Sequence, residues 1–347
     1  MEKQINGICG LANLGNTCFL NSCLQVLNQT HELNILNSVK IKSNIPDSVF
    51  LKEWIDLKNI MSQGNIQNIG IVSPNRFIHV VQQIAQIKNN LLFTGWSQND
   101  LSEFLLLWMD CVHTSISRKI AIKIEGSPAN EKDNMAIQCY KYLQEIYAKE
   151  YSELYDLFYG MYMTTIYDKN NVKVLSMKAE HFFILDLQLF SMNNGNQTVF
   201  HDIYQIFDNY VDREYMFGEN AWYNSKTDKK EDIHKTITFW NLPKILVISL
   251  KRFATDGKRK LQHLIQFPLE NLNLSKYVKG YQSKKYIYDL YAVCNHFGGV
   301  EGGHYTAFVK CSNNWLHFND TSVEKIDLSR IVSPSAYCLF YRKKDSI

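Results

Sequence analysis

The stretch Asn13-Leu-Gly-Asn-Thr-Cys18-Phe-Leu-Asn-Ser-Cys23-Leu-Gln25 contains a glycine turn that leads directly into an apolar helical pattern. The apolar residues that follow helical spacing are Phe19, Leu20, Cys23, Leu24 and Leu27. The pattern predicts a helix that begins at Cys18, where unpaired N–H groups and the helix dipole stabilise negative charge. We therefore expect a thiolate to be favoured there, with the same N–H groups able to hold an oxyanion.

This stretch alone also fits a second interpretation, in which Cys18 is a small buried cysteine that opens an ordinary core helix. Two other cysteines are close by in the sequence. Cys9 lies in an extended approach and Cys23 on the apolar helix face, so neither shares the electrostatic setting of Cys18. Asn13, five residues before Cys18, is close enough for its amide to join an oxyanion hole.

A cysteine nucleophile needs an imidazole to take its proton and a third group to orient that imidazole. Of the ten histidines, His304 alone ends the run Asn295-His-Phe-Gly-Gly-Val-Glu-Gly-Gly-His304, whose two glycine pairs predict a flexible loop before a strand. Such a loop lets an extended peptide approach closely and can gate it. His317 and His296 are rival bases, although strand alternation should turn His317 to the face opposite Phe318.

Fifteen residues after His304, a strand-like run ends at Asn319 and Asp320. A hairpin between the two runs would set Asn319 beside His304, where an amide oxygen can accept the ring N–H and fix the tautomer. Taken singly, each residue has a structural reading. His304 would be a histidine at a loop end, and Asn319-Asp320 a turn.

Composition narrows the class of protein. The 347 residues are 46% hydrophobic, which is enough for a sizeable core. The net charge of +3, from 37 basic and 34 acidic residues, is too balanced to predict a nucleic-acid or membrane partner. The start lacks the apolar core of a secretory signal, so we expect an intracellular protein, cytoplasmic or nuclear, with reduced cysteines. We also expect a monomer without a further targeting domain.

Periodicity indicates helices first and antiparallel strands later, and therefore an α+β fold. Asp100 and Glu103 resemble a capping box at the start of a long helix. Asp168-Lys-Asn-Asn171 reads as a hairpin turn. Further helices are expected at Met135–Ile146 and Tyr151–Phe158, and strands at Phe182–Leu189, Thr236–Trp240, Ile245–Phe253, Tyr286–Asn295, His304–Cys311, Trp315–Phe318 and Tyr337–Tyr341.

Four motifs, taken together, resemble those of the ubiquitin-specific proteases. Gly10 to Gln25 is similar to the family's cysteine box and Tyr291 to Asp320 to its histidine box. Ser97 to Phe104 is similar to its Q-x-D-x-x-E-F element, and Leu242 to Phe253 to its palm strand. The motifs follow the family's order and cover nearly the whole chain.

The resemblance implies a papain-like cysteine protease with a right-hand architecture in a single catalytic domain, residues 1–347. Its parts would be a helical thumb at about 1–158, β fingers at about 160–240 and a β palm at about 241–347. By motif match the catalytic residues are the nucleophile Cys18, the base His304, its orienting partner Asn319, the oxyanion donor Asn13 and the supporting residue Asp320. The matched substrate-binding residues are Gln98, Asp100, Glu103, Gly302, Gly303 and Tyr305. A helix cap is the structural alternative for Asp100.

The implied activity is thiol-dependent hydrolysis of the bond after the C-terminal glycine of ubiquitin, with ubiquitin and ubiquitinated proteins as partners. Two alternatives remain: an inactive ubiquitin-binding scaffold, and a protease for another ubiquitin-like modifier. One feature departs from the family, in which many members hold a fingertip zinc with two C-x-x-C pairs. Here Asp168 and Asn171 stand where the first pair would be, and residues 217–230 contain no cysteine. We therefore predict no structural zinc and no cofactor, with the hairpin held by packing alone.

Overall fold

The computed structural model describes residues 7–64, 70–193, 196–253, 259–299 and 302–344. The chain divides into two compact units, and each is described by itself. Unit 1 comprises Met1–Ser117, Ile248–Ile265 and Leu290–Phe340, and unit 2 comprises Arg118–Val247, Gln266–Asp289 and Tyr341–Ile347. The predicted extent of a single domain, with parts bounded near residues 158 and 240, stays a prediction. No helix among the described residues is both long enough and apolar enough to cross a bilayer.

Unit 1 begins with helices. Its elements in this part are β1 (Cys9–Leu11), α1 (Cys18–Asn28), α2 (Pro46–Met61), β2 (Gly70–Val72), α3 (Asn75–Ile87) and α4 (Leu101–Ile116), with 3₁₀ turns at His31–Asn37 and Leu91–Phe93. The predicted helix at Cys18 is confirmed, as is the helix after Asp100. The Asp100 carboxylate caps α4 by accepting the Ser102 N–H at 2.7 Å, one residue earlier than a capping box requires.

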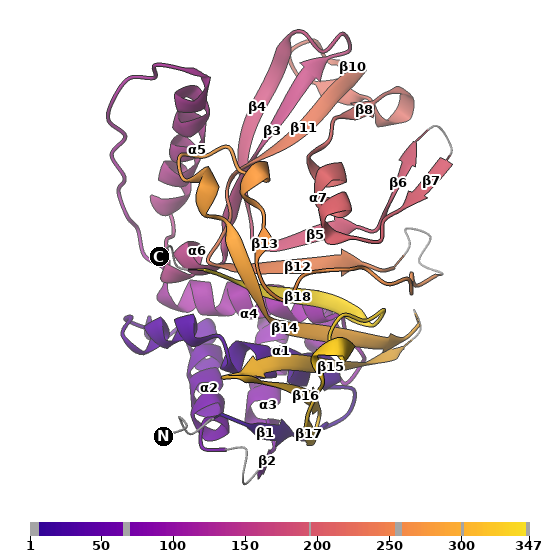
Figure 1. The fold of residues 1–347 in the computed structure, drawn as a ribbon. Helices are drawn as coiled ribbons and strands as arrows, with labels where there is room; N and C mark the ends of the chain where they lie inside the picture. Colours follow the sequence, from indigo (N-terminus) through magenta and orange to yellow (C-terminus); the bar gives the residue numbers. More distant parts are fainter. Residues whose placement is uncertain (1–6, 65–69, 194–195, 254–258, 300–301, 345–347) are drawn as a thin grey trace. The chain divides into compact units, whose positions relative to one another are not determined.

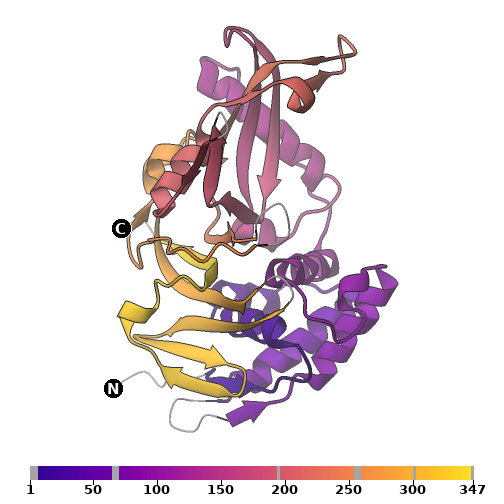
Figure 2. The ribbon, with the colours of Figure 1, turned by 90° about the vertical axis from the view of Figure 1, so that its right-hand side faces the viewer.

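The second part of unit 1 is an antiparallel sheet. Its strands are β15 (Gly303–Cys311), β16 (Asn314–Asn319) and β17 (Ser322–Lys325), together with residues of β12 (Ile245–Lys251), β14 (Ile287–Gly298) and β18 (Ala336–Lys343). The strand order is β17-β16-β15-β14-β18-β12. In Figure 2 these strands lie on one side of unit 1 and the helices on the other. Helix α1 lies against β15 and β16, which explains why all eleven of its residues are buried.

Aromatic and charged contacts fix the helices of unit 1. The ring of Phe19 on α1 lies 6.0 Å from that of Phe104 on α4. The Lys88 ammonium, after α3, lies 2.7 Å from the Asp47 carboxylate of α2 and 2.8 Å from the Asp110 carboxylate of α4. The two ion pairs raise the Lys88 pKa against the opposing effect of burial. These contacts hold the helix layer that carries α1.

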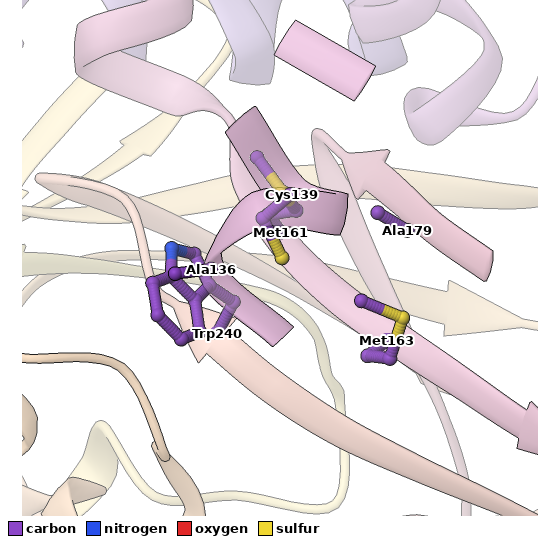
Figure 3. Packing of buried hydrophobic residues seen from close by; sticks show 6 residues of the cluster. All are labelled: Ala136, Cys139, Met161, Met163, Ala179 and Trp240. Carbon is purple, nitrogen blue, oxygen red and sulfur yellow. The ribbon is translucent and has the colours of Figure 1, made fainter. Parts of the chain in front are cut away.

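Unit 2 contains a four-stranded sheet in the order β4-β3-β11-β8 (Figure 1). Its elements are α5 (Glu131–Tyr147), α6 (Glu153–Phe158), β3 (Gly160–Asp168), β4 (Val174–Phe182), β5 (Ile184–Gln188), β6 (Phe190–Asn193), β7 (Asn196–Val199), α7 (Ile203–Val211), β8 (Glu214–Met216), β9 (Trp222–Asn224), β10 (Lys229–Glu231), β11 (Ile233–Asn241) and β13 (Leu272–Asn273). Helix α5 packs on β3 and β4 through a cluster rich in sulfur. Figure 3 shows its members Ala136, Cys139, Met161, Met163, Ala179 and Trp240.

The predicted hairpin at Asp168 is confirmed, but packing alone does not hold it. One oxygen of Asp168 accepts the N–H groups of Val172 at 2.7 Å and Lys173 at 2.9 Å. These bonds hold the pKa of the Asp168 carboxyl below its usual range. Asn171 supplies the left-handed backbone conformation that the turn needs, with a φ of 60°. The turn is therefore stabilised by side-chain capping, which the strand pattern alone did not indicate.

Candidate active site

The turn before α1 is held by Asn13. Its side-chain oxygen accepts the N–H groups of Gly15 at 3.1 Å and Thr17 at 3.2 Å. Gly15 and Asn16 both have positive φ, at 111° and 54°, so the chain turns sharply before the helix begins. This turn places Cys18 at the first position of α1, where its side chain meets helix N–H groups.

The electrostatic setting of Cys18 differs from the sequence-based expectation of a thiolate. Cys18 is only 3% exposed, and this burial raises the pKa of its thiol above the value for free cysteine. A hydrogen bond from the Tyr305 backbone lowers the pKa, the nearby Asp320 charge raises it, and the backbone of Phe19 and of Cys18 itself lowers it. Burial outweighs the helix N–H groups, so the pKa of this thiol is raised, whereas the sequence-based expectation of a favoured thiolate required a lowered pKa.

The raised pKa gives a prediction for the pH dependence of Cys18. A raised pKa keeps the thiol protonated at neutral pH, and only the thiolate is nucleophilic. We expect the rate of Cys18 alkylation by iodoacetamide, followed by peptide mass spectrometry, to rise through a midpoint above about 8.5, the value for free cysteine. A midpoint below pH 7 in the free protein would show that the helix N-terminus dominates.

His304 lies on β15 beside the last residue of β16. Its Nε2 lies 2.6 Å from the Asn319 Oδ1, whereas the nearest Asp320 carboxylate oxygen is 4.0 Å away. The antiparallel pairing of β15 with β16 brings the two side chains together, as the predicted hairpin required. Because Asn319 engages Nε2, the other ring nitrogen, Nδ1, is left to exchange a proton. The next residue, Tyr305, contacts the Cys18 thiol through its backbone, so the strand of His304 runs past the sulfur.

Asp320 joins the two ends of the site. Its carboxylate accepts hydrogen bonds from the Asn13 amide at 2.9 Å and the Asn21 amide at 2.8 Å. The backbone oxygen of Asp320 accepts the Leu11 N–H at 2.8 Å. At the neighbouring Gly10, an added Cβ would lie 2.3 Å from the backbone oxygen of Thr321. Only a glycine admits this close approach of β1 to the turn after β16.

Asn21 is a site residue that sequence reasoning missed. It is 2% exposed and lies on α1, three residues after Cys18. Buried polar side chains need partners, and an asparagine in a buried, largely apolar helix was the available signal. The structure also shows that the Asn13 amide, the predicted oxyanion donor, already donates one hydrogen to Asp320. Its second amide hydrogen remains available for an oxyanion.

Four of the predicted substrate-binding residues take part in side-chain hydrogen bonds or lie beside a residue that does. Gln98, Gly302 and Gly303 lie together, since Gln98 forms two hydrogen bonds with the Gly303 backbone, each 2.8 Å long. Asp100 caps α4 and also accepts the Tyr337 hydroxyl, so both of its oxygens have partners.

The remaining predicted residues differ in exposure. Tyr305 is 6% exposed, and burial raises the pKa of its hydroxyl. Glu103 is exposed near the start of α4. Of the predicted glycine loop, Val300 and Glu301 lie outside the described residues.

The two rival histidines occupy different settings. His296 is 4% exposed, with its ring centroid 4.6 Å from that of Tyr305. Burial first, and then Lys260, lower its pKa to about 4. It is therefore a neutral core residue at pH 7. His317 lies 3.2 Å from the Glu324 carboxylate, in the β16–β17 pair.

Among the described residues, one group of three side chains could hold a metal ion: Asp47, Asp110 and Cys111. The Lys88 ammonium already lies between the two carboxylates, at 2.7 and 2.8 Å. A cation therefore occupies this position within the protein itself. The group is an ion-pair network that joins three helices, not an open ligand set.

Comparisons with known proteins concern the family and the fold of the chain. The family model described as ubiquitin carboxyl-terminal hydrolase matches residues 9–341. Ubiquitin carboxyl-terminal hydrolase 2 of Bos taurus is 30% identical over 356 residues, covering 98% of this chain and 56% of the relative. Ubiquitin carboxyl-terminal hydrolase 21 of Homo sapiens is 28% identical, covering 97% of this chain and 62% of the relative. This chain thus spans about half the length of the curated relatives it matches.

Solved structures show the same fold. One is the SAGA Ubp8/Sgf11/Sus1/Sgf73 DUB module bound to ubiquitin aldehyde, with a TM-score of 0.70 and 23% identity, covering 100% of this chain and 72% of that one. A variant of that module bound to monoubiquitin gives a TM-score of 0.71 at 24% identity, covering 100% and 71%. The predicted α+β fold of the ubiquitin-specific protease type is confirmed. The family model, which matches nearly the whole chain, shows that this protein belongs to the ubiquitin carboxyl-terminal hydrolase family.

Proposed function

We propose that this protein is a thiol-dependent deubiquitinase that hydrolyses the peptide or isopeptide bond after the C-terminal glycine of ubiquitin. His304 lies on the strand that runs past the Cys18 thiol, and its Nε2 lies 2.6 Å from the Asn319 Oδ1. This arrangement is the observation that carries the proposal. A nucleophile at a helix start, a base and a group that orients the base are the parts that acyl transfer to cysteine requires.

In the proposed mechanism, His304 takes the thiol proton of Cys18 at Nδ1 as the sulfur attacks the carbonyl carbon of the terminal glycine. The oxyanion of the tetrahedral intermediate is stabilised by N–H groups at the start of α1 and by the second amide hydrogen of Asn13. His304 then gives its proton to the leaving lysine amine, and a thioester remains. Water, deprotonated by His304, attacks the thioester, and release of the ubiquitin carboxylate restores the thiol.

We further propose that the ubiquitin tail lies along the segment of Gln98, Asp100 and Gly303 in unit 1. The tail carries arginines, which a carboxylate can pair with. Because the Asp100 oxygens already accept the Ser102 N–H and the Tyr337 hydroxyl, the exposed Glu103 carboxylate is the more accessible partner.

We also propose intracellular action as a monomer. The eight free, buried cysteines fit a reducing compartment.

The direct test is a ubiquitin probe with an electrophile at its C-terminus. Covalent labelling at Cys18, located by peptide mass spectrometry, would support both the activity and the substrate. Labelling only by the corresponding probe of another ubiquitin-like modifier would show that the protein is a protease for that modifier. Stable ubiquitin binding without any labelling would instead select the inactive scaffold.

We predict that purified protein contains no structural zinc in unit 2. The support is that Asp168, where the family's first cysteine pair would stand, caps its own hairpin with two hydrogen bonds of 2.7 and 2.9 Å. A tetrahedral zinc site needs four ligands of the cysteine or histidine kind. We expect elemental analysis to find well below one zinc per chain, and the melting temperature to be unchanged by a chelator. One tightly held zinc per chain would contradict this.

A further inference from the structure

Gln98 and Gly303 are joined by a reciprocal pair of hydrogen bonds, although they lie 205 residues apart in the chain. The Gln98 amide nitrogen donates to the Gly303 carbonyl at 2.8 Å, and its amide oxygen accepts the Gly303 N–H at 2.8 Å. One carboxamide thus satisfies both main-chain groups of one residue, as a neighbouring antiparallel strand would.

Gly303 is the residue directly before His304 and the first residue of β15. A Cβ at Gly302 would lie 3.0 Å from the Gln98 amide oxygen, and a Cβ at Gly303 would lie 2.2 Å from the His296 Nε2. Because neither glycine has a side chain, the Gln98 carboxamide and the His296 imidazole can pack against the main chain at these positions. Strand β14 pairs with this segment on one side, with Phe297 opposite His304 and Gly298 opposite Gly303, and the Gln98 carboxamide holds Gly303 from another side.

The segment that carries Gln98 is anchored at Asp100. Gln98 lies two residues before Asp100, which caps α4 through the Ser102 N–H and accepts the Tyr337 hydroxyl of β18. Tyr337 is 6% exposed, so this anchor lies in the core of unit 1. The backbone that carries Gln98 is thereby anchored close to β18, and the exposed Gln98 side chain reaches from it to Gly303.

We propose that Gln98 is a positioning residue: its carboxamide holds the Gly303 backbone, and with it the His304 imidazole, against Asn319. The inference rests on the proposed function, because it concerns the base of that reaction. It goes beyond tail binding, since one N–H and one lone pair of the carboxamide remain for a substrate. Small displacements of a catalytic group reduce the rate strongly, by about a hundredfold for 1 Å.

The kinetic test compares Gln98→Ala and Gln98→Glu with wild type on ubiquitin carrying a C-terminal fluorogenic amide. We expect kcat to fall between about tenfold and a hundredfold while KM stays within about twofold. Gln98→Glu should be at least as impaired, because its carboxylate would face the Gly303 carbonyl oxygen. The matched control is Gln82→Ala, which removes a carboxamide that donates to the Gly95 carbonyl at 3.2 Å. A raised KM with a wild-type kcat would show that Gln98 serves only as a tail ligand and would overturn the proposal.

A second measurement needs no substrate. The Gly303 amide hydrogen, bound by Gln98 in wild type, should exchange with deuterium at least about tenfold faster in Gln98→Ala, with unchanged circular dichroism. Equal exchange rates would reject the positioning role even if the wild-type protein cleaves ubiquitin. Faster exchange in Gln98→Ala would support the contact between Gln98 and Gly303. If the wild-type protein then failed to react with any ubiquitin substrate, the proposed function would be rejected while the contact would still stand.

Discussion

Replacement of Cys18 by Ala is expected to lower the turnover of a ubiquitin C-terminal amide by at least about 10⁴-fold, to the level that binding and the oxyanion donors alone provide. The reason is that no thioester can form without the sulfur. Ubiquitin affinity, measured by calorimetry, should stay within about threefold of wild type, because the side chain is small and sits at the reacting carbon. Retained turnover would reject Cys18 as the nucleophile.

The matched control for this variant is Cys139→Ala in unit 2. Cys139 is a fully buried thiol in the cluster of Figure 3. Its loss should lower the free energy of unfolding by about 1 kcal/mol through a small cavity and leave kcat unchanged. Equal loss of turnover in both variants would show that the loss comes from unfolding of the protein and not from removal of the nucleophile.

Replacement of Asn319 by Ala is expected to lower kcat by about 10²-fold or more, with little change in KM. Asn319 holds the His304 Nε2 at 2.6 Å, so its loss frees the ring to rotate and to adopt the other tautomer. The measurement is steady-state kinetics on the same fluorogenic amide.

The comparison variant is Asp320→Asn, which keeps the size of the side chain but removes its charge. The Asp320 carboxylate lies 4.0 Å from the ring nitrogen and is occupied by Asn13 and Asn21. We therefore expect a smaller loss of kcat than in Asn319→Ala. A larger loss in Asp320→Asn would transfer the orienting role from the amide to the carboxylate.

Local patterns were enough to predict the two halves of the site. The helix at Cys18 follows from a glycine turn and an apolar periodicity within about ten residues. The contact between His304 and Asn319 follows from two strands and one short turn, because antiparallel pairing fixes which residues meet. Helix α7, by contrast, went unpredicted in a region that otherwise reads as strands.

Features that depend on distant parts of the chain could not be predicted. The raised pKa of Cys18 arises from burial and from Asp320, which lies far along the sequence. The bond from Asn21 to Asp320 spans 299 residues and leaves no periodic pattern. One local feature was also missed: the role of Asp168 as a turn cap depends on the backbone conformation at Asn171, which composition does not determine.

The burial of Cys18 and the raised pKa of its thiol affect its chemical durability. Hydrogen peroxide reacts with thiolates to give sulfenic acid, and protonated thiols react slowly. Because this sulfur is buried and the pKa of its thiol is raised, we expect a resting molecule to be shielded from oxidants until a bound partner and His304 draw the proton away. Oxidative loss of activity would then fall mainly on molecules caught during turnover.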